Sequence, residues 1–125
     1  MRTLTSFHFT VPLARAATAD GTSATASHVA EIVTFRVTDG TSASQVAQAA
    51  ASMQPFLKAQ GGMIRRSLSV DADGLWTDHI IWTSMEAAQT AAASVMEAPE
   101  VVPFMSLIVP ESVAMRHAAV HLAQE

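Results

Sequence analysis

The segment RRSLSVDADGLWTDHIIWTSMEAA, residues 65–88, decides the fold. It contains two runs of apolar and β-branched residues, separated by the four residues DADG at 71–74. Asp and Gly tolerate the positive φ values of tight turns, so the segment predicts a β-hairpin of MIRRSLSV (63–70) and LWTDHIIWT (75–83). Thr83 and Glu86 then have the spacing of a capping box, which predicts an alanine-rich helix to about Glu97.

Two further strands and two further helices flank this hairpin. VAEIVTFRV (29–37) is β-branched and aromatic and ends at the turn signal TDG, which predicts the first strand. Ser42 and Gln45 have capping-box spacing, and a helical apolar repeat follows at Val46, Ala49, Ala50, Met53, Phe56 and Leu57. Pro55 is expected to kink or end that helix, and the glycines at 61–62 to stop what remains. Pro99 is expected to open a short helix that Pro110 stops, and SVAMRHAAVHL (112–122) to form the last strand.

The order strand, helix, strand, strand, helix, strand predicts an α+β, ferredoxin-like β-α-β-β-α-β fold. Its four-stranded antiparallel sheet would carry both helices on one face. We assign this domain to residues 28–125, and expect residues 1–27, rich in Thr, Ala and Ser, to form an arm and linker. The arm fits a secretory signal poorly because Ser6, His8 and Thr10 interrupt its apolar stretch. We therefore expect a cytoplasmic protein, with a weak signal peptide as the alternative.

The composition excludes several classes of function. The formal net charge is −4 and no basic cluster exceeds the pair Arg65–Arg66, which argues against nucleic-acid binding. The absence of cysteine excludes disulfides and thiolate chemistry. No apolar run approaches the roughly 20 residues that a membrane span requires.

Both faces of the predicted sheet carry large apolar side chains. Alternation along the third strand places Trp76, Asp78, Ile80 and Trp82 on one side and Leu75, Thr77, His79 and Ile81 on the other. The first strand divides in the same way, into Val29, Glu31, Val33 and Phe35 against Ala30, Ile32, Thr34 and Arg36. Since the helices cover only one face, the apolar area on the other marks an interface. We therefore expect a homodimer in which two sheets pack face to face and enclose a pocket.

Three segments together resemble the antibiotic biosynthesis monooxygenase-like members of the dimeric α+β barrel superfamily. They are HVAEIVTFRVTDG, the hairpin with the start of its helix, and APEVVPFMSLI, and the resemblance covers roughly residues 28–122. It implies a homodimeric barrel with a mostly apolar cavity between the sheet and the helices of each subunit. The superfamily includes cofactor-independent oxygenases of polyketide aromatics, haem-degrading enzymes and muconolactone isomerases, so the resemblance implies oxygenation or isomerisation without a cofactor. The chain has no asparagine, which argues against the haem-degrading branch with its Asn, Trp and His, and no tyrosine, which oxygenase members often use.

Four residues are candidates for acid–base catalysis. His79 or His117 in an apolar pocket could act as a general base, and Glu31 could orient the histidine or be the base itself. Arg116 is the candidate anchor for a carboxylate or enolate oxygen. The structural alternatives are that each histidine caps a strand edge or bonds a partner in the dimer seam, and that Arg116 forms a salt bridge with Glu31 or Asp78.

No metal site is expected from these groups. Asp78 and His79 are adjacent, so they point to opposite faces of a strand. His117 and His121 are roughly 13 Å apart along a strand, and His79 and His117 about 10 Å apart across two strand spacings. These separations suit a small substrate better than one metal ion.

The candidate ligand-binding residues are Phe35, Trp76, Asp78, Trp82, Phe104 and Met115, which could line a cavity for a small hydrophobic or aromatic molecule. Ordinary core packing is the alternative for at least half of them. A pocket with His79 or His117 beside Arg116 would indicate an enzyme. An interior filled by Trp76, Trp82 and methionine side chains would indicate a non-catalytic, ligand-binding or stress-associated dimeric module.

Overall fold

The computed structural model describes residues 27–124, and the predicted N-terminal arm therefore lies outside the described residues apart from Ser27. Four strands form one sheet: β1 (Val29–Phe35), β2 (Met63–Val70), β3 (Trp76–Trp82) and β4 (Ala114–Ala119). The strand order is β2-β3-β1-β4, and each neighbouring pair is antiparallel. The predicted α+β, ferredoxin-like fold is confirmed.

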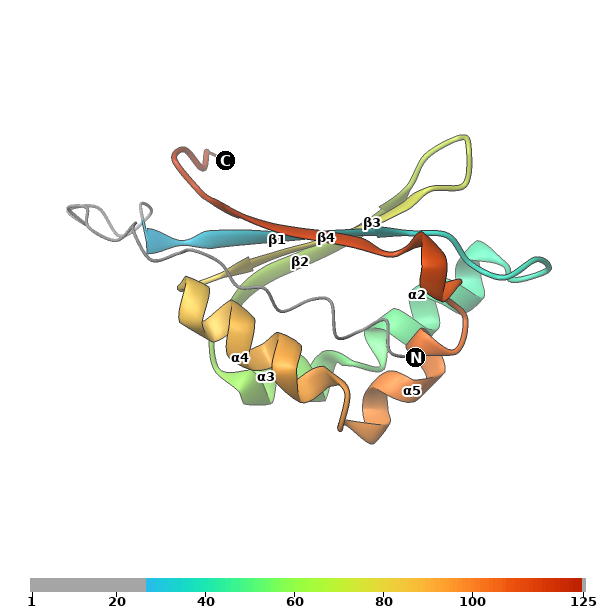
Figure 1. Cartoon of the computed structure of the whole chain (residues 1–125), viewed down its shortest axis with the longest axis horizontal. Coiled ribbons are helices and arrows are strands. Elements are labelled where there is room, and N and C mark those ends of the chain that lie inside the picture. The colour runs from blue at the N-terminus through green and yellow to red at the C-terminus, as the bar shows by residue number, and fades with distance from the viewer. Residues whose placement is uncertain (1–26, 125) are drawn as a thin grey trace.

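Within the described residues, the helices lie on one side of this sheet, and none of them covers its other side (Figure 1). They are α2 (Ala43–Ala51), α3 (Gln54–Gln60), α4 (Met85–Val95) and the short α5 (Val102–Met105), with 3-10 turns at Pro99–Val101 and Pro110–Ser112. No helix in this part of the chain is long and apolar enough to cross a membrane.

The helix boundaries follow the predicted signals, with two exceptions: the N-cap of α4, and the end of the short helix after Pro99, which stops at Met105 rather than at Pro110. Ser42 and Gln45 form the capping box of α2, and the break before α3 places Pro55 in the first turn of that helix. Gly61 ends α3 in the left-handed region, at φ 76°. The predicted N-cap of α4 at Thr83 is wrong, because the cap is Ser84, whose Oγ accepts from the Ala87 N–H at 3.0 Å.

Burial alternates strictly along β3, and this shows which face the helices cover. Trp76, Asp78, Ile80 and Trp82 are buried, whereas Thr77, His79 and Ile81 between them are only partly buried. The register then places Val29, Glu31, Val33 and Phe35 of β1 on the same side, which we call the inner face. The opposite side, bare of helices, is the outer face.

A β-bulge in β2 places Met63 and Arg66 on the same, inner face, although they are three residues apart and would face opposite sides in a regular strand. Met63 pairs with Trp82 and Arg65 pairs with Ile81, so the register shifts by one residue at Ile64. Beyond the bulge, Arg66 pairs with Ile80 and therefore faces inward, as Met63 does.

Aromatic side chains fill the space between the inner face and the helices. Phe35 is completely buried, lies parallel to Trp76 at 6.3 Å between ring centroids, and meets the edge of Phe104 at 5.5 Å. Trp82 is 1% exposed at the other end of the sheet. Fully burying each such side chain contributes about 1.5–3 kcal/mol, so this cluster is a main source of stability.

Candidate functional site

Glu31 is a buried carboxylate held by side chains from two other strands. It lies at the centre of β1 on the inner face and is 8% exposed. Trp82 donates its indole N–H to Oε1 at 3.1 Å, and Nε2 of His117, directly opposite on β4, lies 3.4 Å from the same oxygen. A hydrogen bond from His117 requires the proton on Nε2, because a carboxylate only accepts.

The second oxygen of Glu31 is not committed to a partner. Both contacts go to Oε1, and no other hydrogen bond within residues 27–124 reaches this carboxylate. No buried polar side-chain atom in this part of the chain lacks a partner, so Oε2 must be accessible to solvent rather than sealed. His117 lies on an edge strand with its side chain 16% exposed, so the Glu31–His117 pair is partly exposed at the β4 edge of the sheet.

Asp78 is the other buried carboxylate of the described chain, and both of its oxygens are occupied. Arg66 binds it in a bidentate manner, with Nε at 2.9 Å from Oδ1 and a terminal nitrogen at 2.7 Å from Oδ2. The guanidinium also donates to the Ala50 carbonyl at 2.8 Å and lies 5.7 Å from the centre of the Phe104 ring. This arrangement ties β2 and β3 to α2 and α5, which is a structural role.

The four predicted catalytic residues do not lie on one face of the sheet. Glu31 and His117 face inward as a cross-strand pair, whereas His79 and Arg116 both pair with Ile32 and face outward. His79 and His117 therefore lie on opposite faces of the sheet. The alternative salt bridge from Arg116 to Glu31 or Asp78 is wrong for the same reason, because the sheet separates them.

The six predicted ligand-binding residues lie on the inner face or in the helical layer above it, but most are packed against one another. Phe35, Trp76, Asp78, Trp82 and Phe104 are all buried, and Met115 is partly buried. This interior is closer to the filled arrangement expected of a non-catalytic module than to an open aromatic pocket.

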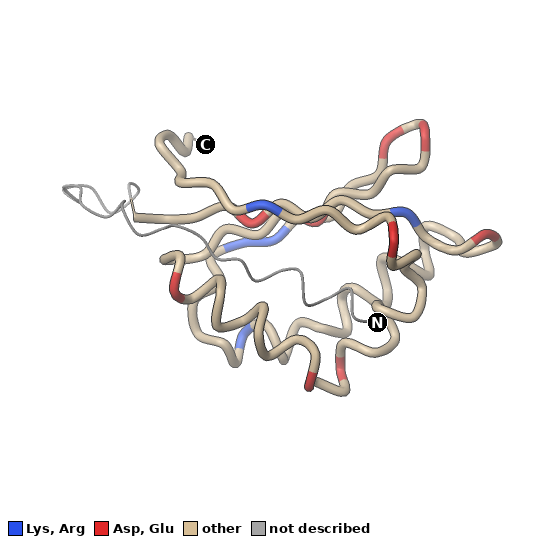
Figure 2. The backbone as a smooth tube through the Cα atoms, viewed as in Figure 1, with Lys and Arg blue, Asp and Glu red and all other residues tan. Residues whose placement is uncertain are grey.

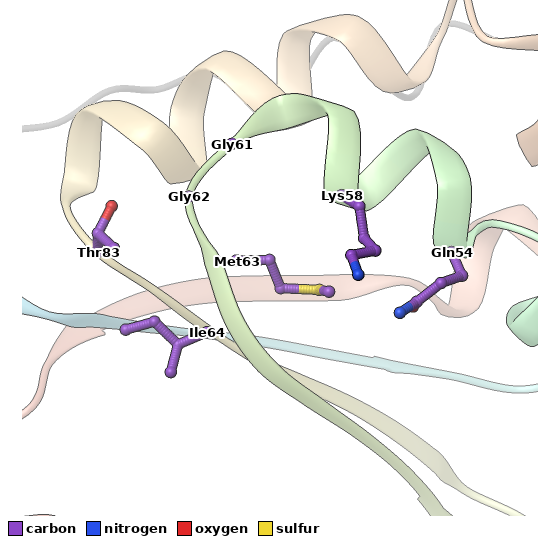
Figure 3. Close-up of a pocket in the computed structure, with 7 residues that line it drawn as sticks. All are labelled: Gln54, Lys58, Gly61, Gly62, Met63, Ile64 and Thr83. Atoms are coloured by element: carbon purple, nitrogen blue, oxygen red, sulfur yellow. The ribbon is translucent and has the colours of Figure 1, made fainter.

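Neither of two surface hollows formed by residues 27–124 includes Glu31. The larger, of about 430 Å³, lies where α3 meets β2 and is lined by Gln54, Lys58, Gly61, Gly62, Met63, Ile64 and Thr83. Figure 3 shows Gln54 and Lys58 extending from α3 toward Met63, with Ile64 directed away. The smaller, of about 110 Å³, is lined by Ile32, Thr34, Ala114, Met115 and Arg116. Among residues 27–124, no three His, Asp or Glu side chains are grouped to hold a metal ion.

Comparison with solved structures gives this architecture its place among known proteins. SnoaB, a cofactor-independent oxygenase from Streptomyces nogalater, is 20% identical and matches 80% of this chain and 97% of its own with a TM-score of 0.57. A Bordetella bronchiseptica protein assigned to the antibiotic biosynthesis monooxygenases is 15% identical and matches 77% of this chain and 99% of its own, with a TM-score of 0.64. The chain shares the fold of these two proteins. The family resemblance expected from the three sequence segments is thus confirmed as a likeness of fold.

The antibiotic biosynthesis monooxygenase fold supports more than one kind of chemistry. A hydroxynitrile lyase from Passiflora edulis matches 80% of this chain and 99% of its own at 15% identity, with a TM-score of 0.53. No family model matches the chain, and no curated protein matches it in sequence. The residues of the site must therefore carry any argument about function.

Sequence reasoning does not identify Arg66 as the partner of Asp78 and treats it only as half of the pair Arg65–Arg66. One signal could have found it: Arg66 alternates with Leu68 and Val70, so it shares a strand face with apolar residues. A charged residue on such a face needs a buried partner, and Asp78 was the acidic residue on the neighbouring strand.

Proposed function

We propose that the protein is a homodimeric enzyme of the antibiotic biosynthesis monooxygenase type, acting without a cofactor on a small hydrophobic or aromatic molecule. The observation that carries the proposal is the state of Glu31, a buried carboxylate with Oε1 occupied by Trp82 and His117 and Oε2 uncommitted. The likeness of fold to SnoaB, a cofactor-independent oxygenase, supports the choice of chemistry.

Glu31 is the general base in this proposal. Oε2 removes a proton from an acidic O–H or C–H of the ligand, and the electron pair remains on the ligand. The hydrogen bonds to Oε1 fix the carboxylate and leave Oε2 to accept the proton. In an isomerisation the proton returns at another atom of the ligand. In an oxygenation of a CH₂ group, dissolved O₂ takes up the electrons, one oxygen atom forming the new C=O and the other leaving as water.

Replacing Glu31 by Gln tests the role of the base. The variant keeps an acceptor for Trp82 but cannot take up a proton at neutral pH, and a positioned general base contributes roughly 10²–10⁴-fold to rate. We expect a loss of that order in oxygen uptake or substrate turnover, measured on polycyclic phenols first selected by thermal shift. The matched control is Glu97→Gln, at an exposed carboxylate after α4, which should leave turnover unchanged. Full turnover by Glu31→Gln would contradict the proposal.

A non-catalytic, ligand-binding or stress-associated dimeric module is the second candidate. The filled interior favours it, because Trp82 beside Glu31 is 1% exposed and neither of the two surface hollows described above includes this carboxylate. The same screen separates the two candidates. Compounds that raise the Tm without being consumed support the module, whereas compounds consumed in a Glu31-dependent manner support the enzyme.

A further inference from the structure

The outer face of the sheet carries charge of only one sign. By register its outward positions are Ala30, Ile32 and Thr34 on β1, Arg65, Ser67 and Ser69 on β2, Thr77, His79 and Ile81 on β3, and Ala114, Arg116 and Ala118 on β4. Two arginines and a histidine are present on this face, with no Asp or Glu.

This distribution is opposite to that of the whole chain, whose formal net charge is −4. The two carboxylates within the strands, Glu31 and Asp78, face inward and are bound there. Figure 2 shows most other acidic segments in the loops and helices, away from the middle of the sheet. The outer face is thus a basic, partly apolar surface on an acidic protein.

Arg116 is the cation on this face that lines a hollow. Within residues 27–124, no hydrogen bond or ion pair holds its guanidinium. The hollow has a volume of about 110 Å³, which is room for about four waters at ~30 Å³ each. Thr34 adds a hydroxyl to its lining, and Ile32 and Ala114 add apolar side chains. Met115 also borders the hollow, but by register its side chain faces the inner side of the sheet.

We propose that this hollow binds the carboxylate of a small ligand with a short apolar stem. A guanidinium binds a carboxylate through two parallel hydrogen bonds, and the Thr34 hydroxyl is a further donor. The apolar lining accommodates a carbon stem, which a bare inorganic anion lacks. His79 lies in the same row as Arg116, one strand beyond Ile32, and adds positive charge when protonated.

Dimerisation would make the bound anion more favourable, because the contact between the two copies would enclose Arg116. This step rests on the homodimer proposed above. A second copy packed on the outer face would bring further arginines toward Arg116 without supplying a carboxylate from its own outer face. Enclosed charges without a partner are strongly destabilising. A bound carboxylate removes that cost, so binding of the ligand and dimerisation should reinforce each other.

The test uses the full chain labelled at the isoleucine δ1 methyls and titrated with sodium butyrate against NaCl of equal ionic strength. We expect a saturable shift of the Ile32 methyl, assigned by Ile32→Val, and no shift of Ile108 in the core. Arg116→Gln should weaken the apparent Kd at least tenfold. Arg65→Gln, which removes the same charge from the same face away from the hollow, should leave the Kd unchanged.

Two results would overturn the inference: no saturable shift at Ile32 in the wild-type chain, or the same Kd in Arg116→Gln. An equal response to inorganic phosphate would overturn the assignment to a carboxylate. Light scattering on the same samples reports the dimer separately. A monomer with an Arg116-dependent shift would contradict the homodimer and support the site.

Discussion

Glu31 and Asp78 lie diagonally on one face of the sheet, yet they are bound in different ways. Arg66 occupies both oxygens of Asp78 at 2.7 and 2.9 Å, so that carboxylate has no position left for a ligand. Glu31 receives both of its donors on one oxygen. Two carboxylates of similar burial therefore divide into a structural group and a group available for chemistry.

Replacing Asp78 by Ala is expected to lower the free energy of unfolding by about 3–5 kcal/mol, because it leaves Arg66 buried without a counter-charge. Urea unfolding followed by circular dichroism measures the change. Asp39→Ala is the control, since the exposed Asp39 should change stability by no more than about 0.5 kcal/mol. The double variant Arg66→Met with Asp78→Leu should recover most of the loss. Equal stabilities of Asp78→Ala and Asp39→Ala would show that the ion pair contributes nothing.

At this scale the sequence identifies the chemical groups but not their partners. Glu31 and His117 were both candidates, yet their pairing depends on a register between strands 86 residues apart. Trp82 was assigned to a ligand cavity, and its indole N–H instead binds Glu31, 51 residues earlier in the chain. Such contacts follow from the alignment of β1 with β3 and β4, which local patterns do not encode.

The junction between α3 and β2 depends on the smallest side chains. A Cβ atom built on Gly62 would lie 2.7 Å from the Cβ of Ala87 on α4 and 3.2 Å from Oγ1 of Thr83. The absence of a side chain at this position therefore lets α4 lie close to the start of β2.

Gly62→Ala is expected to destabilise the protein by about 1–3 kcal/mol, the usual cost of overpacking a tight contact. Ala87→Gly removes the opposing Cβ, so adding it to Gly62→Ala should recover part of the stability. The helix itself loses about 0.5–1 kcal/mol from the new glycine. A double-mutant cycle by chemical unfolding measures the coupling. If the two changes are simply additive, the close approach is not the cause.

Element boundaries could be predicted wherever the signal is local. The capping box at Ser42, the break at Pro55 and the DADG turn depend on neighbouring residues, and all three were correct. Thr83 fails as the N-cap because its N–H still bonds the Gly62 carbonyl at 2.8 Å, as a continuation of the sheet. Ser84, one residue later, is the first residue free to cap α4.

For the molecule as a whole, the outer face of the sheet is the feature that bears on assembly. It exposes Ile32 and Ile81 in part, beside small residues such as Ala118, and no helix covers it (Figure 1). In the proposed homodimer, this face is the contact between the two copies.

Ile81→Lys is expected to convert a homodimer into a monomer at micromolar concentration, because it places a further cation in a contact that already holds arginines without a counter-charge. Size-exclusion chromatography with light scattering measures the mass of the particle. The control is Ala93→Lys, which makes a comparable change on an exposed position of α4 and should remain dimeric. A wild-type monomer, or a dimer in both variants, would contradict face-to-face packing.

The order of elements was predictable because each period, two for strands and near 3.6 for helices, is clear in the sequence. Which face is buried was not, since both faces of β3 contain large apolar residues. The buried set is the one that contains Asp78, and β1 buries the set that contains Glu31. Counting ionisable residues does not separate the faces, because each strand has one on either side: Asp78 against His79, and Glu31 against Arg36. The buried carboxylates are compensated only by tertiary partners.

The bulge at Ile64 also affects how this chain can be compared with others. A homologue with a regular β2 strand would correspond to it residue for residue only if the alignment placed a one-residue gap at Ile64. Without that gap, the alignment would pair Met63 or Arg66 with a homologue's residue on the opposite face of the sheet. The alignment position of Arg66, the partner of Asp78, would then look unconserved. At the 10–20% identity of the structural neighbours, a sequence alignment alone would not reveal a shift of one residue. Insertions and deletions in β2 should therefore be placed from the geometry of the strand.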